Sequence, residues 1–232
     1  MSTTNVRPKE LNYHGYSSAE YDDGIARAIP YHKELHGKIA EVVCNVDPLR
    51  AYAILELGVG TGITTRLVRA LFPNARITAV DFCDTMLAGA RKKLGEVNIR
   101  YILGDYSELL FDSESYKFVV SVIGIHHQTT EGKKALFGKI HTALRHGGKF
   151  IFGDLVTYRD PKVAALNQAR HFHFLVEHAK DEATLTEWAH HHMFLNDLAP
   201  MEDQIEWLEH VGFSVSMEFQ KFNTALLVCV KR

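Results

Sequence analysis

Apolar runs alternate with amphipathic segments through the first two-thirds of the chain. Helical spacing places Ile63, Leu67 and Leu71 on one face, and a later helix over 131–145 is predicted to end at Gly147–Gly148. Strands that are apolar on both sides and alternate with helices favour a parallel sheet covered on both faces. The strands predicted in this way are 53–57, 76–80, 99–103, 117–123 and 149–155.

The pattern changes after residue 156. Residues 158–195 are predicted to be helical, and a short helix near 201–211 precedes two β-rich runs that predict an antiparallel pair in the same sheet. The first 45 residues also predict helices, near 19–28 and 31–43. We therefore expect a single α/β domain over 1–232, with a helical N-terminal cap (1–45) and a helical lid insertion (158–200).

Composition narrows the class of protein. The chain has 232 residues, 46% of them hydrophobic, which allows a sizeable core. Its net charge of -2 and lack of a basic run do not favour nucleic acid as a partner. Three widely spaced cysteines form neither a disulfide framework nor a cysteine-based zinc site. No run approaches the roughly 20 apolar residues of a membrane-spanning helix, and residues 1–10 lack the apolar core of a secretion signal. We expect a cytoplasmic protein.

A glycine turn, E-L-G-V-G-T-G over 56–62, follows the first predicted strand. Because glycine has no Cβ, a ligand can touch the backbone there, and such turns bind nucleotides at the carboxyl end of a parallel sheet. The dinucleotide fingerprint requires a small residue at position 63, which is Ile63 here. The turn therefore predicts a nucleotide-like ligand without a pyrophosphate, held near Gly58 and Gly60.

Acidic residues end the next two predicted strands. Asp81 lies about 20 residues beyond the glycine turn, where a carboxylate accepts hydrogen bonds from ribose hydroxyls. Asp105 can accept from the exocyclic amine of an adenine, with Phe82 and Tyr106 beside the plane of the base. Either acid alone could equally be a helix cap. Together with the glycine turn they predict one adenosyl-binding site.

These segments resemble the class I S-adenosylmethionine-dependent methyltransferases. E-L-G-V-G-T-G, V-D-F-C-D-T-M-L, G-D-Y and L-R-H-G-G-K-F-I-F match that superfamily's successive motifs in order and spacing, over about residues 50–156. The resemblance implies a Rossmann-like, seven-stranded, mostly parallel sheet with an antiparallel last strand, and S-adenosylmethionine as cofactor. The cofactor-binding candidates are Tyr21, Glu56, Gly58, Val59, Gly60, Asp81, Phe82, Met86, Asp105, Tyr106, Val122 and Ile123.

A narrower resemblance reaches both ends of the chain. Y-D-D-G-I-A-R-A-I-P-Y-H (21–32), the helical insertion and F-N-T-A-L-L-V-C-V-K (222–231) are similar to the carboxy-S-adenosylmethionine synthase family. That family's tyrosine falls near Tyr31 or His32, which become further cofactor-binding candidates. Its arginine falls within W-A-H-H-H-M, where this chain has Ala189 and three histidines. The resemblance implies a shared architecture.

Histidines supply the candidate chemistry. His126 and His127 follow the fourth predicted strand, and a histidine there suits a general base near neutral pH; packing beneath the cofactor is the other interpretation. An asparagine-proline-proline-tyrosine-like motif is absent at this point, which favours a small-molecule acceptor over a DNA base. The candidate acceptor-binding residues are Tyr16, His127, Tyr158, His171 and His173.

The other histidines do not predict a metal site. On a helix, His171 and His173 point about 200° apart, and His190–His192 spread around the axis. Zinc needs three or four convergent ligands, and no local spacing supplies them. We expect a methyltransferase acting on an oxygen, nitrogen or sulfur atom of a small molecule, with the insertion as a candidate homodimer surface. Two alternatives stay open: a carboxy-S-adenosylmethionine synthase-like enzyme, and a non-catalytic S-adenosylmethionine-binding interaction protein.

Overall fold

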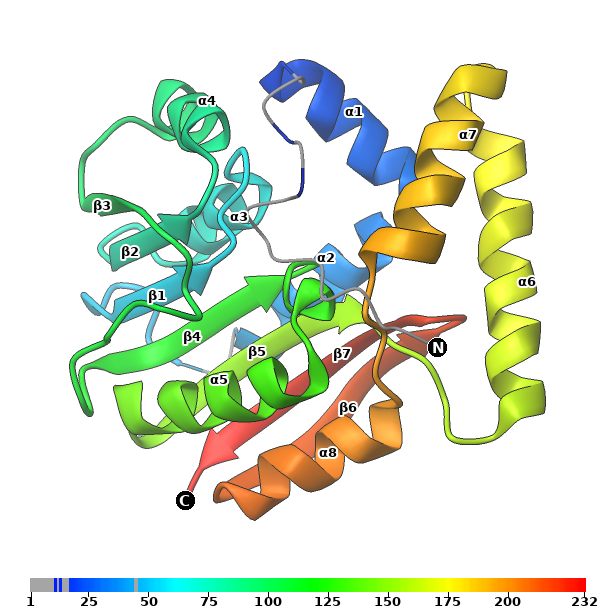
Figure 1. Cartoon of the computed structure of the whole chain (residues 1–232). Coiled ribbons are helices and arrows are strands. Elements are labelled where there is room, and N and C mark those ends of the chain that lie inside the picture. The colour runs from blue at the N-terminus through cyan, green and yellow to red at the C-terminus, as the bar shows by residue number, and fades with distance from the viewer. Residues whose placement is uncertain (1–10, 12, 14–16, 44–45) are drawn as a thin grey trace.

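A twisted sheet runs through the centre of the protein (Figure 1). The computed structural model describes residues 11, 13, 17–43 and 46–232. In this part of the chain the sheet has seven strands in the order β3-β2-β1-β4-β5-β7-β6. The strands are β1 (Ala53–Leu57), β2 (Arg76–Asp81), β3 (Ile99–Leu103), β4 (Tyr116–Val122), β5 (Leu144–Leu155), β6 (Phe213–Lys221) and β7 (Thr224–Lys231).

Strand pairing confirms the predicted sheet. The first five strands are parallel, β7 is antiparallel to β5, and β6 is antiparallel to β7. The sheet order reverses between β1 and β4, so the carboxyl ends of these two strands border a crevice of the kind in which open α/β sheets bind ligands. The fold class predicted from the sequence is therefore correct, including the reversed last strand.

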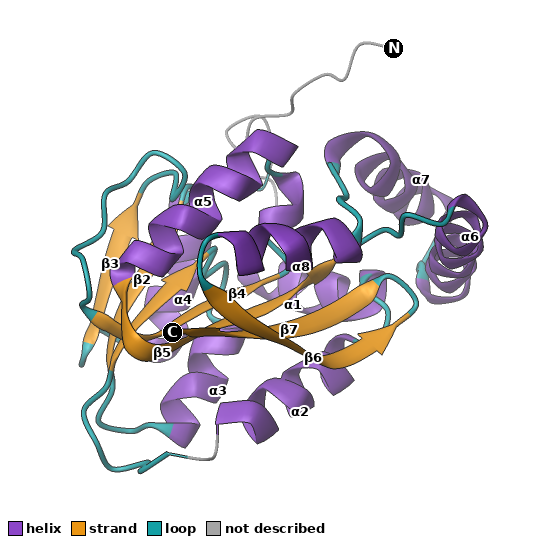
Figure 2. Ribbon diagram, turned by 90° about the horizontal axis from the view of Figure 1, so that it is seen from below, coloured by secondary structure: helices purple, strands orange, loops and turns teal. Residues whose placement is uncertain are grey.

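Helices cover both faces of the sheet. Apolar side chains of α2, α3 and α4 pack on one face, and those of α5 and α8 pack on the other (Figure 2). The helices are α1 (Ser18–Ala28), α2 (His32–Val43), α3 (Ile63–Leu71), α4 (Asp84–Leu94), α5 (Thr130–Ala143), α6 (Pro161–His178), α7 (Glu182–His190) and α8 (Met201–His210), with a 3-10 helix η2 (Ile125–His127) and a π-helix η3 (His191–Leu195).

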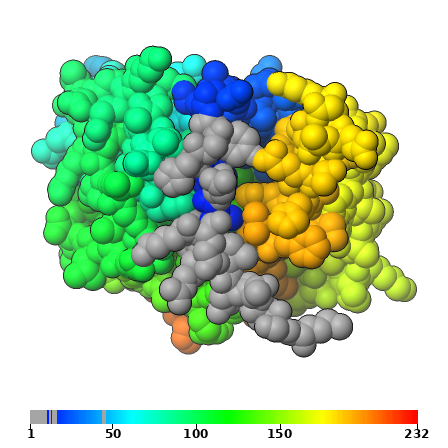
Figure 3. All heavy atoms as spheres, turned by 45° about the horizontal axis from the view of Figure 1, so that its top comes forward, coloured from blue at the N-terminus to red at the C-terminus, as the bar shows by residue number. Residues whose placement is uncertain are grey.

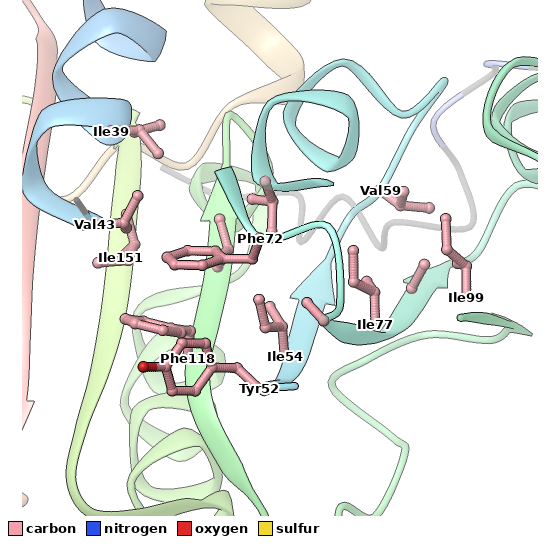
Figure 4. Packing of buried hydrophobic residues seen from close by; sticks show 14 of the residues in the cluster. Ile39, Val43, Tyr52, Ile54, Val59, Phe72, Ile77, Ile99, Phe118 and Ile151 are labelled. Atoms are coloured by element: carbon pink, nitrogen blue, oxygen red, sulfur yellow. The ribbon is translucent and has the colours of Figure 1, made fainter. Parts of the chain in front are cut away.

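Aromatic stacking anchors the face covered by α2, α3 and α4 (Figure 4). The rings of Phe72 and Phe118 stack with centroids 5.5 Å apart, and Tyr52 meets both of them edge to face. Such aromatic pairs each contribute about 0.5–1.5 kcal/mol beyond their buried area. This cluster lies near the amino ends of β1 and β4, whereas the crevice lies at their carboxyl ends.

Helices α1, α6 and α7 form a separate layer beside the carboxyl ends of β4 and β5 (Figure 1). A capping box between Ser17 and Glu20 begins α1, and Asp160 caps α6. Arg27 of α1 joins the three helices: its guanidinium donates to the backbone oxygen of His178 (3.2 Å) and lies 5.5 Å from the ring centre of Trp188. Figure 3 shows α1 between the cyan-to-green half of the chain and the yellow-to-orange insertion.

One predicted boundary is wrong. The helix expected over 131–145 ends at Ala143, and Leu144 already begins β5. The register of β5 against β4 shifts between Leu144 and Lys149, so the glycines form an irregularity within the strand. A Cβ on Gly148 would stand 2.7 Å from the backbone oxygen of Arg145, and this close approach requires glycine. The glycine pair was therefore a strand feature rather than a helix stop.

The predicted helical segments of the insertion and of residues 17–43 are present. The limits proposed for the domain, the cap and the lid stay predictions. Within the described ranges, every helix is too short or too polar to cross a membrane.

Candidate active site

The glycine turn after β1 exposes its backbone. Gly60 has a φ of +53°, and the nearest atom to a Cβ placed there is Cε1 of Tyr21 at 3.9 Å. Gly62 differs, because a Cβ on it would come within 2.6 Å of Cδ1 of Leu94 in α4. The turn thus separates two tasks. Gly60 faces open space that a ligand can occupy, and Gly62 lets α3 pack against α4.

Asp81, at the end of β2, is held beside this turn. Its Oδ2 accepts the backbone N–H of Gly60 at 2.7 Å, and its Oδ1 accepts that of Cys83 at 2.9 Å. Burial raises the pKa of Asp81 above its ordinary value. The backbone of Phe82 also hydrogen-bonds the carboxylate, and since its two oxygens together have about four lone-pair sites, acceptor capacity remains for a ligand hydroxyl. Asp81 is therefore a fixed acceptor at the crevice wall.

One crevice collects most of the predicted cofactor residues. Tyr106 forms part of its wall, and the Tyr106 hydroxyl donates to the backbone oxygen of Gly124 at 2.9 Å, which fixes the ring. The predicted residues that line the crevice are Tyr21, His32, Gly58, Val59, Gly60, Asp81, Phe82, Met86, Tyr106, Val122 and Ile123.

Three predicted cofactor residues are not brought to this crevice. Glu56 is buried beneath the turn and accepts the Thr65 hydroxyl at 2.7 Å; burial raises its pKa to about 8. Asp105 accepts the backbone N–H and hydroxyl of Ser107 at 2.8 and 2.6 Å. Tyr31, at a φ of +58°, packs edge to face on Phe222 with ring centres 5.0 Å apart.

A second cavity, of about 260 Å³, adjoins the crevice between η2, α1, α6 and the end of α7. Five residues line both spaces: Tyr13, Tyr21, Ile25, Ile123 and His127. Ile123 has a φ of +52°, a left-handed conformation that is strained for a β-branched side chain and costs about 1–3 kcal/mol. Strain of this kind gathers at functional sites. The two spaces are thus neighbours, as a cofactor site and an acceptor site must be.

His126, which lines this second cavity, forms a buried pair with Asp154 behind it. Nδ1 of His126 lies 2.5 Å from Oδ1 of Asp154, and both side chains are at most 3% exposed. Oδ2 of Asp154 accepts the backbone N–H groups of Ile125 and His126, each at 2.9 Å. The carboxylate therefore holds the proton of His126 on Nδ1, and Nε2 has no hydrogen-bond partner among the described residues.

His127 is oriented from both sides. Its Nδ1 donates to the backbone oxygen of Leu195 at 2.9 Å, and its Nε2 accepts the Tyr13 hydroxyl at 3.1 Å. Burial raises the pKa of Tyr13 well above its ordinary value, so the hydroxyl keeps its proton. Burial lowers the pKa of His127 well below its ordinary value and that of His191 to about 4. These imidazoles are neutral near pH 7.

The predicted acceptor residues divide between this cavity and other surfaces. His127 and His171 line the cavity, and Nδ1 of His171 is hydrogen-bonded to the Asn223 amide. Tyr158 lies apart, with its hydroxyl accepting from Nε2 of Gln220 at 2.6 Å. His173 is 73% exposed, beside Glu177. Tyr16 lies outside the described residues.

Comparisons with known proteins indicate the family. A family model described as a methyltransferase domain matches residues 54–148. An uncharacterized methyltransferase of Anoxybacillus flavithermus is 29% identical over 75% of this chain and 82% of its own length. The carboxy-S-adenosyl-L-methionine synthase of Campylobacter curvus is 25% identical over 67% of this chain and 66% of its own. These matches support the class I S-adenosylmethionine-dependent methyltransferase superfamily for this chain.

A solved structure has a similar fold. Phosphoethanolamine N-methyltransferase 2 of Haemonchus contortus, solved in complex with S-adenosyl-L-methionine, is 16% identical with a TM-score of 0.67. The match covers 97% of this methyltransferase and 59% of that chain. At this identity the likeness shows the fold alone.

The methyltransferase has residues that fit S-adenosylmethionine as cofactor. The open backbone at Gly60 and the remaining lone pairs of Asp81 suit an adenosyl group with its ribose diol. Tyr13 and Tyr21 pack edge to face at 5.9 Å and narrow the crevice to about 80 Å³, below the roughly 300–1,000 Å³ typical of ligand pockets. We expect these two rings to turn aside when the cofactor binds.

Sequence reasoning missed several residues of the methyltransferase cavity. Asp154 could have been found, because it ends a parallel strand at the same edge as Asp81. His36 follows His32 by one helical turn and also lines the crevice. His191 and Trp188 gave no such signal, since only the packing of α7 against α1 and α6 brings them to the cavity.

Proposed function

We propose that this methyltransferase transfers the methyl group of S-adenosylmethionine to an oxygen, nitrogen or sulfur atom of a small molecule held in the second cavity. The observation that carries the proposal is the wall of five residues shared by the cofactor crevice and that cavity. A volume of about 260 Å³ is slightly below the roughly 300–1,000 Å³ typical of small-molecule pockets. This size favours a compact acceptor.

The charge of the cavity further narrows the acceptor. In the described part of the chain no lysine or arginine lines it, whereas Glu20 and Glu187 do. The histidines whose pKa is lowered by burial add no positive charge at neutral pH. A carboxylate would therefore be buried without a cationic partner, which is unfavourable. An uncharged or basic acceptor suits this cavity.

Methyl transfer requires alignment of the nucleophile and exclusion of water. S-adenosylmethionine, when bound, supplies an electrophilic methyl group on a sulfonium. His127 lines both spaces and His126 lines the second cavity, where the buried carboxylate of Asp154 faces Nδ1 of His126 and leaves Nε2 as its other nitrogen. These two histidines are our candidates for activating the acceptor's nucleophilic atom, in agreement with the sequence-based prediction.

The proposal is tested by measuring the release of S-adenosylhomocysteine. The protein is incubated with S-adenosylmethionine and a panel of small alcohols, phenols, amines and thiols. We expect turnover with a member of this panel and a large loss of turnover in His126→Ala and His127→Ala, larger than any loss of cofactor affinity measured by calorimetry. His173→Ala, a surface change on α6, is the matched control. Full activity of both cavity variants on the best acceptor would refute the assignment.

The carboxy-S-adenosylmethionine synthase alternative is less well supported. The cavity lining has no guanidinium to pair with an extra carboxylate in the part of the chain that the structure covers. Mass spectrometry of the ligand that copurifies with the protein separates the two, because a carboxylated sulfonium has a larger mass. A homodimer through the insertion and a cytoplasmic location stay predictions; sedimentation analysis tests the first.

A further inference from the structure

Three histidines meet at the wall of the acceptor cavity. His126 and His127 come from η2, and His191 begins the π-helix η3. One nitrogen from each lies within 4.8 Å of the others. The ring centres of His126 and His127 are 4.0 Å apart, and those of His127 and His191 are 5.3 Å apart. Three imidazole nitrogens therefore converge from two distant segments.

The second nitrogen of two of these rings is already engaged. Nδ1 of His126 faces Asp154 at 2.5 Å, and Nδ1 of His127 donates to the backbone oxygen of Leu195 at 2.9 Å. Histidines that bind metals characteristically donate their other N–H to a carboxylate or a backbone carbonyl, which orients the ring. Both supporting contacts of this kind are present here, and both leave Nε2 as the other ring nitrogen of its histidine.

The local backbone also favours a site at this position. His191 and Leu195 are the two ends of one π-helical turn, so that turn supplies a donor ring and the carbonyl that orients His127. Single π-turns are rare and are frequent at functional sites. The cluster is thus built by two short irregular helices rather than by a regular surface helix.

We propose that His126, His127 and His191 bind one divalent transition-metal ion, with Zn²⁺ as the ion of best fit. Imidazole nitrogens suit zinc and its neighbours in the first transition row, and three protein ligands with an open fourth position are typical of catalytic zinc. Bonds of about 2.0–2.1 Å in a tetrahedral arrangement set the nitrogens about 3.4 Å apart. The rings therefore draw together by roughly 1 Å on binding, and the Tyr13 hydroxyl leaves Nε2 of His127.

This inference rests on the proposed acceptor cavity and states how the histidines activate the acceptor. The bound ion would act as a Lewis acid, and its open position would suit an oxygen or sulfur atom of the acceptor, which keeps a further lone pair for attack. Coordination to a divalent ion strongly lowers the pKa of a bound group, as it does for water on zinc. The acceptor would lose its proton to solvent and form the bond to the methyl carbon, while the electron pair of the broken carbon–sulfur bond stays on sulfur.

Calorimetric titration of the untagged, chelator-treated full chain with Zn²⁺ tests the site without cofactor or acceptor. We expect one ion per chain, and an absorption spectrum typical of tetrahedral coordination when Co²⁺ is used instead. His191→Ala should weaken Zn²⁺ binding by more than about 100-fold. This exceeds the loss of about 10- to 100-fold that is typical when a residue hydrogen-bonded to a metal ligand is removed. His173→Ala, which lies outside the cluster, should bind as the wild type does.

Thermal melting followed by circular dichroism checks that each variant folds. The Co²⁺ spectrum is recorded on the wild type, so it tests the site even if a variant does not fold. Absence of saturable binding to the wild type, or equal binding to His191→Ala, would overturn the metal site. If the metal-free chain still releases S-adenosylhomocysteine with its acceptor, the proposed function stands and only this inference fails. If the ion binds and no acceptor is methylated, the metal site stands and the proposed function fails.

Discussion

Nδ1 of His126 and Oδ1 of Asp154 lie 2.5 Å apart although η2 and β5 are separated by the whole of α5. The carboxylate also accepts two backbone N–H groups of η2, so it fixes the helix as well as the ring. One residue at the end of β5 thereby sets the direction in which His126 presents its free nitrogen. This relationship links the parallel sheet to the proposed chemistry.

Asp154→Asn should lower turnover by about 10- to 100-fold. The amide oxygen can keep the backbone hydrogen bonds, which turns the NH2 group toward Nδ1 and drives the proton of His126 to Nε2. Nε2 then neither accepts a proton nor binds an ion. Steady-state kinetics and cofactor calorimetry measure the effect, with Asp112→Asn, an exposed acid between β3 and β4, as control. Unchanged turnover would mean that His126 has no role in the reaction.

Asp81→Ala should weaken the binding of S-adenosylmethionine by about 10- to 100-fold. Hydrogen bonds to a charged acceptor contribute about 1.5–3 kcal/mol, and each 1.4 kcal/mol corresponds to a factor of ten. Asp105→Ala provides the comparison, because Asp105 is engaged with Ser107 and does not line the crevice. Calorimetry should give a nearly normal affinity for that variant. A larger loss in Asp105→Ala than in Asp81→Ala would contradict the placement of the ribose.

The two glycines of the turn should respond differently to alanine. Gly62→Ala forces a Cβ against Leu94 at a φ of +87° and should lower stability by about 1–3 kcal/mol. At about 2–4 °C per kcal/mol, its melting temperature should fall by several degrees. Gly60→Ala also strains the backbone, at a φ of +53°, but meets no such clash; its methyl group enters the crevice, so this variant should in addition weaken cofactor binding. Equal effects of the two variants on both thermal melting and calorimetry would argue against separate tasks.

Acid should destabilise the fold between about pH 6.5 and pH 4. Burial lowers the pKa of His32, His171 and His191 to about 4, whereas in the unfolded chain histidine titrates near 6.5. Between these values the unfolded state binds more protons, so the free energy of unfolding falls as the pH falls. Urea denaturation at a series of pH values measures this slope.

A matched pair on α6 tests the assignment of that slope. His171→Gln removes a buried histidine and should flatten the pH dependence, whereas His173→Gln removes an exposed one and should leave it unchanged. Glu56 acts in the opposite sense between about pH 4.5 and 8: its pKa is raised to about 8, so the stabilisation present below pH 4.5 is lost as the pH rises to 8, and it partly offsets the slope from the histidines. A wild-type midpoint that does not vary between pH 4 and 6.5 would contradict the burial of these neutral rings.

Local patterns determined the elements and their order. Apolar periodicity gave the strands, the helices and the antiparallel pair at the end, because burial on a sheet or helix face constrains neighbouring positions directly. The glycine turn and Asp81 were also visible in the sequence, since both follow strand ends whose carboxyl edges must lie together in a parallel sheet. The glycine pair before residue 149 misled the prediction, because glycine serves a strand irregularity as readily as a helix end.

Only the tertiary structure decided which side chains converge. Glu56, Asp105 and Tyr31 follow the expected motifs, yet each is turned to a neighbouring group instead of the crevice. His191 meets His126 and His127 because α7 packs against α6 and continues into a π-turn, which no local spacing predicts. Backbone periodicity is a short-range property, whereas the direction of a side chain into a shared cavity depends on how distant elements pack.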